Sequence, residues 1–133
     1  MKVSELPPGR LHSVQPTATL ADIARQMRMN DSDSVAVMSD GKLIGIVTER
    51  DLVAAIADGV NPIQARADVV MSAEPATVGQ DEEVAVVAMK MMRLGIRHLP
   101  VLDRAGQPIG LLSARDLVAA LDRRNCLSSK ARG

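Results

Sequence analysis

The sequence predicts an α+β fold made of two copies of one unit, each in the order strand, helix, strand, strand, helix. Three observations predict it. The stretch 45–55 recurs at 110–120, an offset of 65 residues. Apolar residues recur at helical spacing at matching places in both copies. Two apolar runs joined by a tight turn follow each of these helices. Because an internal repeat decides the architecture, we divide the chain into repeats 1–64 and 65–133, which are small enough to need a shared core.

The first helix of each repeat is predicted by apolar residues at positions i, i+3, i+4 and i+7. This pattern runs through 20–27 in the first repeat and through 84–91 in the second, 64 residues later. Thr17 or Thr19 can cap the first of these helices, and Asp81 can cap the second. Short strands are expected before them, near 11–14 and 76–78.

A β-hairpin is predicted after each of these helices. Gly41 and Gly106 stand in the two turns, where glycine supplies the positive φ that a tight hairpin requires. A second helix is then expected to begin near Thr48 and near Ser113, and the segment 58–62 ends the first of these and opens the linker. The strand runs that flank the turns are 35–38 and 43–47 in the first repeat, and 99–102 and 109–112 in the second.

The order of these elements, with these residues, resembles the CBS domain pair, the cystathionine-β-synthase-type module. The matching segments are 45–52, 96–103 and 110–117, and 69–72 resembles the stretch that commonly opens the second CBS repeat. The resemblance covers nearly the whole chain. It implies that the two repeats pack through their sheets with pseudo-two-fold symmetry, and that adenosine ligands occupy one or both of the clefts between them.

Each repeat carries the same polar pair where its last strand gives way to a helix. Thr48 is followed three residues later by Asp51, and Ser113 by Asp116. A helix N-terminus offers unpaired N–H groups to a phosphate, and an aspartate can accept both hydroxyl groups of a ribose. The same spacing is also a variant of the capping box, in which both side chains only satisfy backbone donors. The resemblance favours the ribose role for at least one copy.

The resemblance also implies phosphate-binding and adenine-binding positions. Arg97 and His98 would meet phosphate, although they also fit a surface pair at a helix-to-strand joint. The first repeat has Asp33 and Ser34 at these positions, so we do not expect two equivalent phosphate sites. We expect the cleft that contains Asp51 to bind first, because the other cleft departs from the family pattern. The adenine shell would be Ser72, Ala76, Ile96 and Arg97 in the Asp51 cleft, and 7–9, His12 and Ser32 in the other.

The composition argues against several other functions. The chain has no aromatic residue and equal numbers of basic and acidic residues, 16 each, which argues against a general nucleic-acid binder. A lone cysteine, Cys126, and two unpaired histidines give no metal-ligand spacing, and no catalytic constellation emerges. We find no signal peptide and no apolar run of about 20 residues that could span a membrane, so we expect a cytoplasmic protein.

These observations favour a regulatory protein without enzymatic activity that binds an adenosine nucleotide, AMP, ADP or ATP, between its repeats. The alternatives are a scaffold that binds no ligand and only dimerises, or a regulator that binds S-adenosylmethionine, NAD(H) or nucleic acid. Helix faces rich in Ala, Met and Val predict a homodimer. The sequence does not identify an effector protein that such a regulator would act on.

Overall fold

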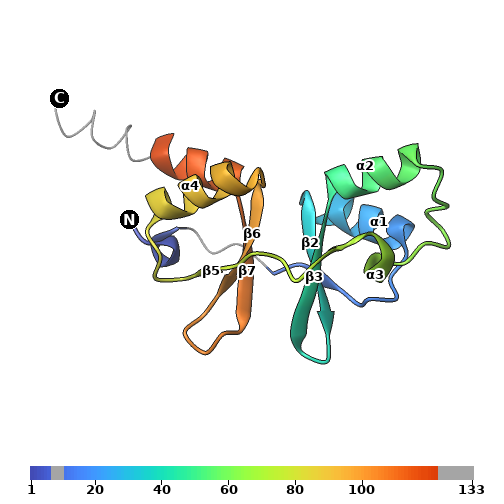
Figure 1. Ribbon diagram of the computed structural model, residues 1–133, viewed down its shortest axis with the longest axis horizontal. Coiled ribbons are helices and arrows are strands. Elements are labelled where there is room, and N and C mark those ends of the chain that lie inside the picture. Colours follow the sequence, from blue (N-terminus) through green and yellow to red (C-terminus); the bar gives the residue numbers. More distant parts are fainter. Residues whose placement is uncertain (7–10, 123–133) are drawn as a thin grey trace.

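The computed structural model describes residues 1–6 and 11–122. Two halves lie side by side, and in each half helices cover the outer side of a small sheet (Figure 1). The strand order is β1-β2-β3-β4 in the first sheet and β5-β6-β7 in the second. Strands β2 and β7 lie against each other where the halves meet. The predicted α+β fold of two units packed through their sheets is therefore confirmed. Within the described ranges, no helix is long and apolar enough to cross a membrane.

The first half follows the predicted order, with a short helix added in the linker. Strands β2 and β3 form the predicted antiparallel hairpin, β1 lies parallel to β2, and β4 lies antiparallel to β3. Gly41 has a φ of 75° in the hairpin turn, as the sequence predicted. The elements are β1 (Ser13–Val14), α1 (Leu20–Asn30), β2 (Ser34–Ser39), β3 (Lys42–Thr48), α2 (Glu49–Ala57), α3 (Ala67–Val70) and β4 (Ser72–Ala73).

The second half repeats this arrangement with a shorter sheet. Strand β5 lies parallel to β6, and β6 pairs antiparallel with β7. A helix over residues 114–122 follows β7, as predicted from the repeat. The other elements are η1 (Val3–Glu5), β5 (Val78–Gly79), α4 (Val84–Leu94), β6 (His98–Leu102) and β7 (Pro108–Ser113).

The expectation of one shared core is wrong, because each half has its own apolar core. Neither core contains an aromatic residue. The helical spacing places one face of α1 in the first core and one face of α4 in the second. The first core is built from Leu20, Ile23, Met27, Val35, Val37, Val47, Leu52, Ala55 and Ala67. The second is built from Val3, Leu6, Val78, Val84, Val87, Met91, Leu99, Val101, Leu112, Leu117 and Ala120.

Packing crosses the predicted boundary at residue 64 in both directions. The N-terminal turn η1 packs on the second half, where the Val3 amide donates to the Glu82 carbonyl oxygen at 2.9 Å. The linker helix α3 instead packs on the first half, where Ala67 is fully buried. The division at residue 64 therefore remains a prediction about the sequence repeat. In the folded chain, the N-terminal turn packs on the second half and the linker helix packs on the first.

One close approach fixes this linker against the first sheet. Gly45 lies in β3 opposite Ala73 of β4, and the side chain of Met71 rests directly on it. A Cβ atom at Gly45 would stand 3.0 Å from the Met71 Cβ and would collide with the atoms beyond it. Glycine is required here by space, because a larger residue would force the linker away from the strand.

The prediction that Thr19 could cap the first helix is confirmed, while the prediction for Asp81 is wrong. Thr19 Oγ1 accepts from the Asp22 amide at 3.1 Å and so caps α1. Helix α4 begins at Val84 with Glu83 at its N-cap, and no side chain caps it. Asp81 stands two residues before that cap and accepts from Arg104 Nε at 2.9 Å. This hydrogen bond to the Arg104 guanidinium holds the pKa of Asp81 below its ordinary value.

Candidate functional site

The two predicted Asp residues stand at equivalent helix starts, and both take part in capping boxes. The Thr48 amide donates to Asp51 Oδ2 at 2.8 Å, and Thr48 Oγ1 accepts from the Asp51 amide at 3.4 Å. In the second half, the Ser113 amide donates to Asp116 Oδ2 at 2.8 Å, and Ser113 Oγ accepts from the Asp116 amide at 3.1 Å. The capping-box role that the sequence allowed for these two pairs is therefore present in both halves. The capping bonds use Oδ2 alone, so they leave Oδ1 to a possible ligand.

The backbone places different residues beside the two helix starts. The Glu49 amide, at the start of α2, donates to the carbonyl oxygen of Asp33 at 3.0 Å. The matching amide of Ala114 donates to the carbonyl oxygen of Arg97 at 2.8 Å. An anion at the first helix start would thus have an aspartate as its neighbour, while an anion at the second would have an arginine.

One ion pair joins the two halves between these helix starts. His98 Nε2 lies 3.0 Å from Asp33 Oδ1, which gives an ion pair when the imidazole is protonated. The Nε2 atom is buried, but its direction does not meet hydrogen-bond geometry, so the contact is electrostatic and poorly aligned. His98, which was predicted to meet phosphate, thus contacts Asp33, the first-half residue that matches Arg97 in the repeat.

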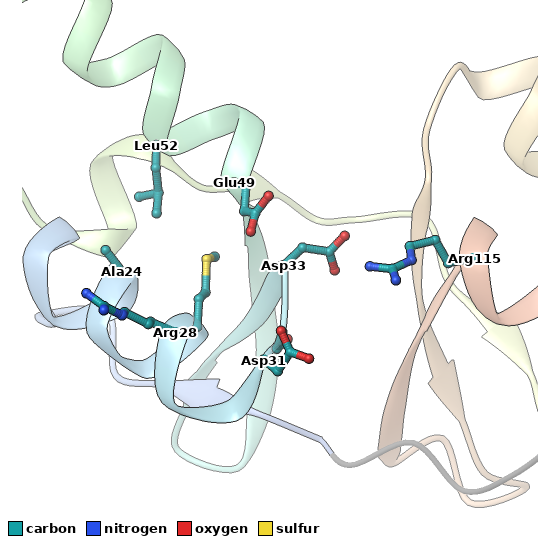
Figure 2. Close-up of a pocket in the computed structure, with 9 residues that line it drawn as sticks. Ala24, Arg28, Asp31, Asp33, Glu49, Leu52 and Arg115 are labelled. Carbon is teal, nitrogen blue, oxygen red and sulfur yellow. The ribbon is translucent and has the colours of Figure 1, made fainter.

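A pocket opens beside this ion pair, at the end of α1 and the start of α2. Its volume is about 410 Å³. Figure 2 shows Arg115, from the second half, pointing across toward Asp33 at the start of β2. Arg115 was not predicted as a site residue. The repeat could have pointed to it, because Arg50 holds the equivalent position in the first half. The lining residues are Ala24, Met27, Arg28, Asp31, Ser32, Asp33, Glu49, Leu52 and Arg115.

The internal repeat seen in the fold is also found when the chain is compared with known protein families. The CBS domain family matches this chain at residues 3–58 and again at residues 65–123. The chain belongs to the CBS domain family. Its two matches follow each other as the two halves do, so the molecule is a CBS pair.

Relatives of this CBS pair include proteins of similar and of greater length. The 17.7 kDa protein in the bps2 3′ region of Acidianus ambivalens is 33% identical over 90% of this chain and 73% of its own length. Protein MK0525 of Methanopyrus kandleri is 38% identical over 77% of this chain, which spans only 54% of it. Among solved structures, the CBS domain protein PAE2072 of Pyrobaculum aerophilum, complexed with AMP, is 29% identical with a TM-score of 0.80. That alignment covers 87% of this chain and 89% of the other.

The remaining positions expected around the ligand are spread over both halves of the CBS pair. Ser72 lies exposed in β4, paired with Ile46 of β3 and thus two residues from Thr48 along the sheet. Ala76 and Ile96 are half-buried and pack against the second core. Their role as an adenine shell remains a prediction. Of the shell expected for the other cleft, 7–9 lies outside the described residues.

Proposed function

We propose that this CBS pair binds an adenosine nucleotide where its halves meet and acts as a regulatory module without enzymatic activity. The observation that carries the proposal is the repeated helix start with a ribose-type acceptor, Asp51 or Asp116, beside an inter-half ion pair. The AMP bound to the relative PAE2072, which is 29% identical, supports the same ligand class here.

We place the phosphate at the start of the helix over residues 114–122. The Ala114 and Asp116 amides of this turn already have acceptors, so its attraction for an anion comes from the positive end of the helix dipole and from the cationic side chain beside it. Arg97 adjoins this turn through its backbone, while the side chain of Arg115 points away from it toward Asp33 (Figure 2). One guanidinium group can donate two parallel hydrogen bonds to a phosphate, which makes the contact stronger and fixes its orientation. Asp116 is exposed beside them and would accept from the ribose hydroxyls.

This placement differs from the Asp51 cleft, which we expected from the sequence to bind first. Beside Thr48 the fold sets Asp33 and Glu49, whose carboxylates would repel a phosphate. The Asp51 side therefore remains suited to a ribose but is less suited to a nucleotide. A ligand that contacts both halves would change how they are held together, and that is how we expect binding to be reported to an effector.

A ligand that binds only the folded state raises the melting temperature. We expect AMP, ADP or ATP at about 100 times its dissociation constant to add about 2.7 kcal/mol to the free energy of unfolding. For a domain of this size that shift amounts to several degrees. Thermal melting with each nucleotide, with S-adenosylmethionine and with NADH as competing candidates, measures it. A melting temperature that none of the adenosine nucleotides raises would favour the alternative of a ligand-free scaffold.

We also propose that the CBS pair forms a homodimer through its helices. Val53 and Ile56 of α2 are 67% and 61% exposed, and Val118 and Leu121 of the helix over 114–122 are 65% and 51% exposed. These two apolar pairs stand 65 residues apart, and the helices that carry them both lie along the top of the view in Figure 1. The exposed surface thus shares the approximate two-fold symmetry of the repeat, which suits contact with a second copy.

Light scattering at high micromolar concentration is expected to give twice the chain mass. Placing a lysine at Ile56 and at Leu121 is expected to give a monomer with an unchanged circular dichroism spectrum, because both side chains are exposed in the single chain. As a matched control, the exposed Met29 of α1 lies outside these two apolar pairs, so Met29→Lys should leave the dimer intact. A monomeric parent protein would contradict this proposal.

A further inference from the structure

The two helix starts differ in charge at three equivalent positions of the repeat, although Arg28 and Arg115 also line the pocket at the start of α2. Asp33 occupies the place of Arg97, and Glu49 occupies the place of Ala114. Farther along the same pocket, Asp31 stands where the second half has Gly95. Three carboxylates in the first half are therefore matched by one guanidinium and two uncharged residues in the second.

Asp33 lies at the contact between the halves. Its main chain is tied to the start of α2 through the Glu49 amide, at 3.0 Å. Its side chain is held from the opposite half by His98, 3.0 Å away, and Arg115 points toward it (Figure 2). Asp33 lines the pocket at the start of α2, so a phosphate bound there would lie near this carboxylate and be repelled by it.

We propose that Asp33 is a specificity-determining residue that excludes phosphate from the pocket at the start of α2. This inference rests on the proposed nucleotide function and deepens it. The CBS pair then binds one nucleotide, with its phosphate on the Arg97 side, although both halves carry the ribose-type acceptor. The repeat gives two helix starts that could each bind a nucleotide, and the charge of Asp33 makes their affinities for phosphate unequal.

Calorimetric titration of AMP into the parent protein, Asp33→Asn and Asp33→Arg tests this inference. We expect one AMP per chain for the parent and two for Asp33→Arg, which restores the charge found at Arg97. Asp33→Asn removes the negative charge without adding a positive one. It should raise the affinity for AMP at the start of α2 by roughly tenfold, about 1.4 kcal/mol. Adenosine, which lacks phosphate, should bind the parent and both variants equally. Asp58→Asn is the matched control, because Asp58 is an exposed carboxylate at the opposite end of α2, and it should leave one AMP per chain.

The outcomes separate this inference from the function on which it rests. Two AMP molecules of equal affinity on the parent would overturn the role of Asp33 and leave nucleotide binding intact. A single AMP on a folded Asp33→Arg variant, with the parent melting temperature, would overturn it as well. A change of AMP and adenosine affinity by the same factor would show that Asp33 acts through the fold and not on phosphate. A parent that binds no AMP at all would instead refute the proposed function.

Discussion

Leu99→Ala is expected to lower the free energy of unfolding by about 2–5 kcal/mol. Leu99 lies in β6 with no exposed surface, and it is among the largest fully buried side chains of the chain. Because the second core has no aromatic residue to fill a gap, truncation leaves a cavity lined by small aliphatic side chains such as Val78 and Val87. Urea denaturation followed by circular dichroism measures the loss.

Leu94→Ala provides the matched control for this truncation. Leu94 ends α4 in the same half, and its surface is 52% exposed. The same atoms are removed, so the change should stay within about 0.5 kcal/mol, as is usual for a surface position. Equal losses in the two variants would contradict the placement of β6 at the centre of the second core.

Asp116→Ala is expected to weaken AMP binding by roughly tenfold or more, which corresponds to at least about 1.4 kcal/mol. The carboxylate would lose its hydrogen bonds to the ribose, and hydrogen bonds to charged groups are stronger than average. Asp51→Ala is the matched control, since Asp51 accepts the same backbone hydrogen bond at its own helix start and a further one from Thr48 Oγ1. Both variants should lose about 0.5–2 kcal/mol of stability through the cap. Only the Asp116 variant should lose most of its AMP affinity.

Calorimetry on the two variants and the parent protein distinguishes the roles. A larger loss of affinity in the Asp51 variant would return the nucleotide to the first half, as the sequence had led us to expect. Lower stability with unchanged affinity in both variants would show that Asp51 and Asp116 serve only as caps.

Much of the fold could be predicted because the chain contains it twice. The helical spacing of Leu20 to Met27 and of Val84 to Met91, each followed by a glycine turn, appears in both repeats. The linker helix α3 and the turn η1 were not predicted. Both are short, and their burial depends on surfaces formed by distant residues, such as Gly45 for the linker. Local sequence carries little information on such contacts.

The candidate site could be predicted residue by residue, but not how its members combine. The repeat shows that Asp33 and Arg97 hold matching places. It does not show that each adjoins the helix start of its own half, because that depends on the β2–β3 and β6–β7 pairing. The approach of His98 to Asp33 depends in turn on how the two sheets meet. Which helix start binds the phosphate therefore stays a prediction, and the geometry around Asp33 is what leads us to propose the second one.

The central claim is that this CBS pair binds an adenosine nucleotide through its phosphate as well as its ribose. Calorimetric titration of the parent protein with AMP and, separately, with adenosine tests it most directly. We expect saturable binding of AMP that is roughly tenfold or more tighter than that of adenosine, because only AMP has a phosphate for the Arg97 guanidinium beside the second helix start. Equal affinity for the two ligands, or no heat of binding with millimolar AMP, would contradict it.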